Sequence, residues 1–73
     1  MTIMLTKKQL KVFDFIVDHV KKERIPPTVR EISEACQTVG SNVHRMLRLL
    51  EREGYIKVHT AKPRGIEVLK QLD

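Results

Sequence analysis

A segment near the middle of the chain decides the fold: residues 28–54 read TVREISEACQTVGSNVHRMLRLLEREG. Thr28 and Glu31 have the spacing of a capping box, in which each side chain accepts a hydrogen bond from the other residue's backbone N–H at the start of a helix. Apolar residues follow at helical spacing. We therefore expect a helix of about two turns over residues 28–36.

The second half of this segment predicts another helix. Residues 37–40 leave room only for a tight turn, and Ser41 is the expected N-cap of a helix over residues 41–53. Gly54 suits the left-handed backbone conformation just past a helix end. Two helices joined by a tight turn that contains glycine form a helix-turn-helix.

The residues before this segment predict one further helix. Thr6 and Gln9 form another capping-box pattern, and apolar side chains recur behind them at steps of three and four residues. Pro26 and Pro27 remove backbone donors and disfavour helical geometry in the residue that precedes each of them. The first helix is therefore expected over residues 6–23.

After Gly54 the period of the apolar residues changes from about 3.6 to about 2, which is typical of strands. The alternation predicts strands over residues 55–59 and 65–69, joined by a basic loop. The predicted fold is mainly α with a small β-hairpin. It is a three-helix winged helix-turn-helix, in a single domain that spans residues 1–73.

The charge distribution favours a polyanionic partner. The 73 residues include 14 Lys and Arg against 9 Asp and Glu, a formal net charge of +5. Residues 38–65 hold six of these cations and two carboxylates, a net charge of +4, so the excess lies in the third helix and the hairpin. Such a local imbalance is typical of a nucleic-acid-binding surface.

Other classes of function lack their sequence signals. A single cysteine excludes a disulfide framework and a cysteine-rich zinc module, and no apolar run is long enough to span a bilayer. The start of the chain has no signal-peptide pattern, so we expect a cytoplasmic, nucleoid-associated protein. Metal-ligand spacing, phosphate loops and nucleophile motifs are absent from the sequence. We therefore expect no enzyme activity, no cofactor, no metal site and no small-molecule substrate.

The third predicted helix has one apolar face and one face of hydrogen-bond donors. At about 100° per residue, the donor face and its flanks carry the candidate base-reading residues Ser41, Asn42, His44, Arg45 and Arg48. In the major groove, arginine pairs bidentately with guanine and asparagine pairs with adenine. Arg52 lies farther from the start of the helix, so a flanking phosphate is its expected target.

A set of motifs runs in order through most of the chain. They are Leu5-Thr-Lys-Lys-Gln9, Pro26-Pro27-Thr28, Arg30-Glu31-Ile32, Val43-His44, Gly54-Tyr55-Ile56 and Lys62-Pro63-Arg64-Gly65-Ile66. In this combination, over about residues 5–70, the chain resembles the N-terminal DNA-binding domain of LexA-type SOS repressors. The resemblance implies a bacterial or phage transcriptional repressor that binds a palindromic operator in double-stranded DNA, with two copies per site.

The resemblance also implies which residues contact DNA. The family reads bases with the start of the third helix, which matches Ser41, Asn42, His44 and Arg45, with Arg48 close behind. The family contacts the DNA backbone with the start of the second helix and with the wing, which is the β-hairpin that follows the third helix. The matching residues are Arg30 in the second helix and His59, Lys62 and Arg64 in the wing. With Arg52, they are the expected backbone contacts. About five phosphate contacts predict a slope of log affinity against log salt near −4 to −5.

Repressors of this family have a second domain with a self-cleaving Ser/Lys dyad, and that domain has no counterpart in this sequence. Ser33 and Ser41 are the only serines of the chain, and both fall in the helix-turn-helix. We therefore expect no self-cleavage by the chain itself.

A second class of function is compatible with the same fold. A winged helix can be a protein-interaction module, such as an adaptor or antirepressor, with only non-specific affinity for DNA. Leu49 and Tyr55 would then be its apolar anchors. RNA binding is disfavoured because aromatic residues, which stack on unpaired bases, make up only 4% of the chain. Sequence-specific binding of duplex DNA is the preferred interpretation, because the helix order, the acid-poor donor face and the basic hairpin occur together.

Overall fold

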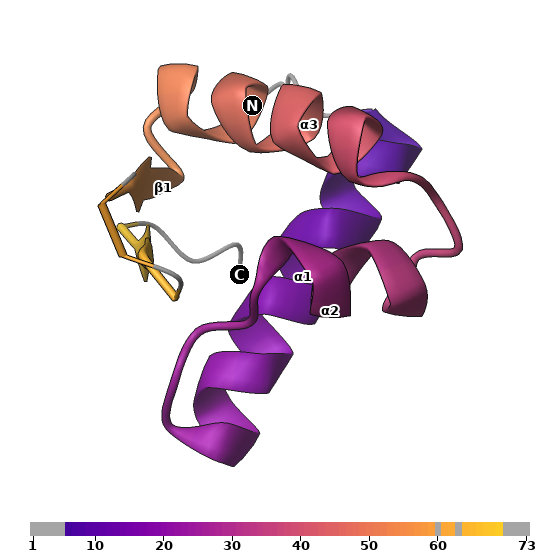
Figure 1. The fold of residues 1–73 in the computed structure, drawn as a ribbon. Helices are drawn as coiled ribbons and strands as arrows, with labels where there is room; N and C mark the ends of the chain where they lie inside the picture. The colour runs from indigo at the N-terminus through magenta and orange to yellow at the C-terminus, as the bar shows by residue number, and fades with distance from the viewer. Residues whose placement is uncertain (1–5, 60, 63, 70–73) are drawn as a thin grey trace.

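The computed structural model describes residues 6–59, 61–62 and 64–69. Within these residues the elements are α1 (Lys7–Glu23), α2 (Val29–Ala35), α3 (Gly40–Arg52), β1 (Ile56–Val58) and β2 (Ile66–Val68). The two strands form an antiparallel hairpin that follows the C-terminal end of α3 (Figure 1). The arrangement confirms the predicted fold class, a mainly helical winged helix-turn-helix.

Both predicted capping boxes form. The Thr6 hydroxyl accepts a hydrogen bond from the Gln9 N–H at 3.2 Å, and the Gln9 side chain accepts one from the Thr6 N–H at 2.9 Å. Thr28 and Glu31 make the same reciprocal pair at 3.1 and 2.8 Å. The threonines are caps outside the helices, so α1 and α2 begin one residue later than predicted. The second helix also ends one residue earlier, because Cys36 is its C-cap. At the other end of α1, Arg24 takes a left-handed conformation with φ of 65°.

The start of α3 differs from the prediction that Ser41 would be its cap. The helix begins at Gly40 with Val39 as its N-cap, because the Val39 carbonyl already accepts hydrogen bonds from Asn42 and Val43. The preceding turn closes early: Gln37 takes φ of 54°, and Thr38 donates to the carbonyl of Ser33 at 3.0 Å. The left-handed residue of the turn is therefore Gln37 rather than a glycine, and α3 starts and ends one residue earlier than expected.

The N-cap of α3 offers a test of stability. No side chain among the described residues caps this helix, and the Val39 side chain is 65% exposed. Replacing Val39 by serine is expected to stabilise the fold by about 1 kcal/mol, because a hydroxyl at this extended position can accept from the first turn. The thermal midpoint should rise by about 4–8 °C. Val39→Ala is the matched control, and an equal gain in both variants would contradict the capping explanation.

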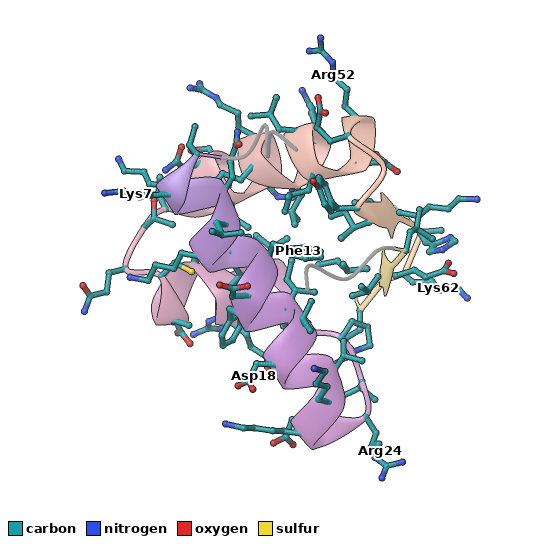
Figure 2. The ribbon with its side chains drawn as sticks, turned by 180° about the vertical axis from the view of Figure 1, so that it is seen from behind. Lys7, Phe13, Asp18, Arg24, Arg52 and Lys62 are labelled. Atoms are coloured by element: carbon teal, nitrogen blue, oxygen red, sulfur yellow. The ribbon has the colours of Figure 1, made fainter. Side chains whose placement is uncertain are left out.

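The core lies where the three helices meet the hairpin. Phe13 and Ile16 of α1, Ile32 of α2, Leu50 of α3 and Ile56 of β1 are almost fully buried. Phe13 points from α1 toward the middle of the molecule (Figure 2). Each element thus contributes large apolar side chains to one cluster, and this burial holds α3 in a defined orientation.

Tyr55 belongs to the edge of this core. Its ring lies edge-on to that of Phe13, with centroids 5.3 Å apart, and its side chain is only partly exposed. The packing favours a structural role for Tyr55 over that of an anchor for a partner protein.

The hairpin buries the predicted apolar side, but its strands are shorter than predicted. Ile56 pairs with Val68 and Val58 pairs with Ile66, so the apolar residues share one face. The predicted strands over residues 55–59 and 65–69 each lose one residue at both ends. Single hydrogen bonds still continue the pairing there, from Leu69 to Tyr55 at 2.8 Å and from His59 to Gly65 at 2.7 Å, but the regular ladder stops before them.

None of the helices in the described part of the chain has the length and apolar character needed to cross a membrane.

Candidate nucleic-acid interface

The two faces of α3 separate as the sequence predicted. The apolar residues Val43, Met46, Leu47 and Leu50 are buried. The exposed side chains Ser41, His44, Arg45 and Arg48 line one open hollow on the opposite side. Four of the five candidate base-reading residues are therefore together on one outward face, held by the burial of the other face.

Asn42 is the exception among the candidate base-reading residues. Its amide nitrogen donates to the Thr38 hydroxyl at 2.9 Å, and its side chain is half-buried. It lines a different hollow, together with Lys8 and Lys11 of α1. Asn42 thus holds the turn before α3, and it would have to leave Thr38 to reach a base.

The wing lies next to α3. His44 and Leu47 of α3 line a hollow with His59 and Lys62 of the wing, and Val29 of α2 closes it. The carboxylate of Glu51, near the end of α3, accepts a hydrogen bond from the Val58 N–H at 2.9 Å. This bond and the buried side chains of the strands attach β1 and β2 to the rest of the domain.

The candidate phosphate contacts differ in how free they are. Arg52 and Lys62 are exposed and project outward, from the end of α3 and from the wing (Figure 2). Arg30 is 87% exposed and forms an ion pair with Glu34 at 3.5 Å. His59 contacts Glu67 across the hairpin at 3.1 Å. The Arg30 pair is so exposed that it contributes little to stability, so Arg30 can exchange Glu34 for a phosphate at small cost.

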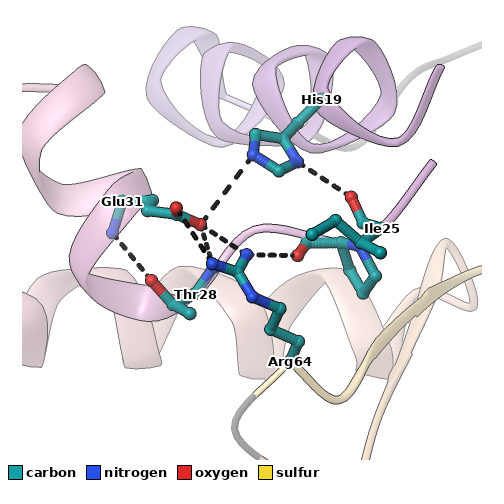
Figure 3. A network of polar contacts seen from close by, with 6 residues as sticks. His19, Ile25, Thr28, Glu31 and Arg64 are labelled. Atoms are coloured by element: carbon teal, nitrogen blue, oxygen red, sulfur yellow. Dashed lines mark hydrogen bonds and ion pairs between the residues drawn. The ribbon is translucent and has the colours of Figure 1, made fainter. Parts of the chain in front are cut away.

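Arg64 has a different environment from the other candidates (Figure 3). Its Nη1 donates to Glu31 Oε1 at 2.8 Å and to the Pro26 carbonyl at 2.9 Å, and its Nη2 donates to Glu31 Oε2 at 3.2 Å. His19 joins the same group, with Nε2 3.8 Å from Glu31 Oε1 and Nδ1 2.8 Å from the Ile25 carbonyl. The network links α1, the proline turn, α2 and the wing.

The network changes the titration of its carboxylate. The hydrogen bonds from Arg64 and from the Thr28 N–H lower the pKa of Glu31 from 4.5 to about 2. The same interaction raises the pKa of Arg64. Both effects favour the charged pair at neutral pH.

The acid dependence of folding follows from this pKa. Because the pKa of Glu31 is lower in the folded protein, its contribution to stability is complete above about pH 4.5 and is lost as the pH falls toward 2. We expect the difference in thermal midpoint between wild type and Glu31→Gln to narrow over that range. A carboxyl-carbon NMR titration of Glu31 measures the pKa directly, and a midpoint near 4.5 would contradict the pairing.

Two features of this surface have no clear signal in the sequence. Glu31 has the position of a helix cap, but its carboxylate also binds Arg64, 33 positions away. Val39 is exposed at the start of α3, where the sequence favours Ser41 as the cap. Arg64 and Glu31 carry opposite charges, but the sequence holds many such pairs and does not show which of them come into contact.

Among the described residues, no group of three or more His, Cys, Asp or Glu side chains is placed to hold a metal ion.

A helix-turn-helix whose second helix presents a cationic outward face, with a β-hairpin beside it, defines a winged helix-turn-helix domain of the nucleic-acid-binding type. The sequence matches the family described as the LexA DNA binding domain over residues 2–65, and the chain belongs to that family.

LexA repressors are among the proteins that are similar to this chain. The chain is 48% identical over 66 residues to the LexA repressor of Shouchella clausii. This match covers 89% of the chain and 32% of the repressor. It is 44% identical over 68 residues to that of Staphylococcus haemolyticus, covering 92% of the chain and 33% of the repressor. It is 45% identical over 71 residues to the LexA repressor of Staphylococcus epidermidis, and this match covers 94% of the chain and 34% of the repressor. The chain spans about a third of the length of these relatives.

Proposed function

We propose that the chain is a sequence-specific DNA-binding domain that represses transcription by occupying an operator in double-stranded DNA. The observation that carries this proposal is the outward face of α3, where Ser41, His44, Arg45 and Arg48 lie together while the opposite face is buried. A recognition helix needs this arrangement, because it must present donors to base edges without losing its fixed orientation.

Base reading is assigned to the first turns of α3. Arg45 is exposed there and has the reach and planar fork for bidentate pairing with guanine. Ser41 and His44 are the shorter readers, and Arg48 reaches either a base or a phosphate one turn later. Asn42 is proposed as a reader only after it releases Thr38.

Backbone contacts are assigned to the exposed cations around α3. Arg30, Arg52 and Lys62 point away from the core on three different elements, and His59 lies beside Lys62. Contacts of this kind position the domain on the duplex without reading its sequence.

The biological setting follows from the relatives. They are named LexA repressors, and this chain matches about a third of each. We propose a palindromic operator, two copies per site and action at the nucleoid in the cytoplasm. One domain covers only a half-site, and a two-fold symmetric site accommodates two copies.

Selection from a random duplex pool at physiological salt tests the proposal. We expect the recovered sequences to share a palindrome whose half-sites are one helical turn apart or a multiple of it. A pool without any shared sequence would contradict it and would favour the protein-interaction module, for which Leu49 would be the anchor to examine.

Two alanine substitutions separate base reading from positioning. Arg45→Ala is expected to remove about 1–3 kcal/mol of discrimination at one base pair and leave the others unchanged. Lys62→Ala should weaken all duplexes alike and reduce the salt slope by about 1. The selected duplex and single-base variants of it, titrated by fluorescence anisotropy, give both quantities. Equal, sequence-independent losses in the two variants would contradict the division of roles.

A further inference from the structure

We propose that Arg64 is a positioning residue, which holds the wing through Glu31 so that Lys62 faces the DNA backbone, and that it is not itself a phosphate contact. This inference rests on the proposed DNA binding and replaces one of its expected contacts.

The first support is the geometry of the pair. The guanidinium group meets both oxygens of the Glu31 carboxylate, at 2.8 and 3.2 Å, and one of its nitrogens also donates to the Pro26 carbonyl at 2.9 Å. A two-pronged contact of this kind fixes orientation as well as distance. Figure 3 shows the carboxylate between Arg64, the Thr28 N–H and His19.

The second support is the place of Arg64 in the wing. The strands of the hairpin are attached by Ile56 and Ile66, which are buried, and by the bond from Val58 to Glu51. The loop between the strands carries Lys62, which is exposed. Arg64 lies at the end of that loop and connects it to the start of α2, so the pair restrains the segment that presents Lys62.

The third support is electrostatic. The Glu31 carboxylate keeps its charge at neutral pH, since its pKa is about 2. Arg64 and Glu31 therefore form a pair with no net charge. When such a pair lies near a phosphate, it displaces few of the cations that are condensed on the DNA. For Arg64 to bind a phosphate, it would have to break its bonds to Glu31 and leave that carboxylate near the DNA without its partner.

The substitution Glu31→Gln tests the proposal because the two roles of Arg64 predict opposite signs. Glutamine still serves as the partner in a capping box, but it cannot accept both prongs of Arg64 as a charged carboxylate does. If Arg64 positions the wing, affinity for the selected duplex falls by up to about fivefold, the value of one phosphate contact at 0.15 M salt. If Arg64 binds phosphate, the variant frees it and removes a negative charge, so affinity rises, and the proposal is overturned.

Glu34→Gln is the matched control. It lies on the same helix, makes the same change of charge and loses only the exposed pair with Arg30, so its affinity should stay equal or rise. Thermal melting of both variants shows that each is folded at the temperature of the titration.

A double-variant cycle gives a second readout. Arg64→Ala and Lys62→Ala should each cost about fivefold, and the double variant should cost about fivefold as well, because both remove the same phosphate contact. Independent phosphate contacts would multiply to about 25-fold, which would overturn the proposal.

Hydrogen exchange in the free protein separates this proposal from the proposed function. The His59 N–H donates to the Gly65 carbonyl at 2.7 Å inside the wing. Glu31→Gln should speed exchange at this amide several-fold relative to Glu34→Gln, whether or not DNA is present. If the exchange rate of the His59 amide is unchanged in Glu31→Gln, the positioning role is overturned. If that rate rises as expected but the wild type shows no preference among duplexes, only the proposed DNA-binding function is overturned.

Discussion

Duplex binding is expected to weaken about 40-fold when the salt concentration rises from 50 to 200 mM, measured per bound copy. Arg30, Arg52 and Lys62 remain as the Lys and Arg backbone contacts once Arg64 is assigned to Glu31. Three such contacts correspond to a log–log slope of about −2.7, because each neutralised phosphate releases condensed counterions. Fluorescence anisotropy with a labelled half-site duplex at four or five salt concentrations gives the slope.

The same titration distinguishes the alternatives. A fourth charged contact from Arg64 would give a slope of about −3.6 and a loss of about 150-fold. Arg64→Ala is the internal check. A slope of about −1.8 in this variant means that the Lys62 contact is lost with Arg64, whereas loss of a direct Arg64 contact alone leaves a slope of about −2.7. A slope near zero would contradict a DNA interface on this face altogether.

Replacing Leu50 by alanine is expected to lower the free energy of unfolding by about 2–5 kcal/mol. Leu50 is fully buried on the inner face of α3, and its removal leaves a cavity where α3 packs on the rest of the core. A chain of 73 residues has only about 4–11 kcal/mol of total stability. Much of the population is therefore expected to unfold under mild denaturant, as urea titration followed by circular dichroism would show.

Leu49→Ala is the control for this prediction. Leu49 lies next in sequence on the same helix but is partly exposed. The same truncation there is expected to cost about 1 kcal/mol or less. Equal losses at the two positions would mean that the inner face of α3 does not carry the stability of the domain.

The helices and the hairpin were predictable because their signals are local. The capping boxes at Thr6 and Thr28 lie within four residues, and the apolar spacing of each helix lies within a few turns. The period-2 alternation around Ile56 and Ile66 likewise predicted which side of the hairpin is buried. The start of α3 was predicted wrongly because serine is a better N-cap than valine, which favours Ser41 over Val39 when only propensity is considered. In the structure the turn closes at the left-handed Gln37, and Val39 is the N-cap.

The outward face of α3 was also predictable, since helical periodicity separates Arg45 and Arg48 from the buried residues. The partners of individual polar residues were not. Asn42 has the same polar character as Ser41, yet its neighbour Thr38 holds it at the turn.

The sequence by itself determined the order of the elements, the caps of the first two helices and the face that carries the cations, because each depends on neighbours a few residues apart. Only the tertiary structure decided that Arg64 meets Glu31 and that Lys62 lies beside α3. Those contacts join residues many positions apart. Which of several equivalent charges come together depends on how the packed core places α2 and the hairpin, and no local pattern records it.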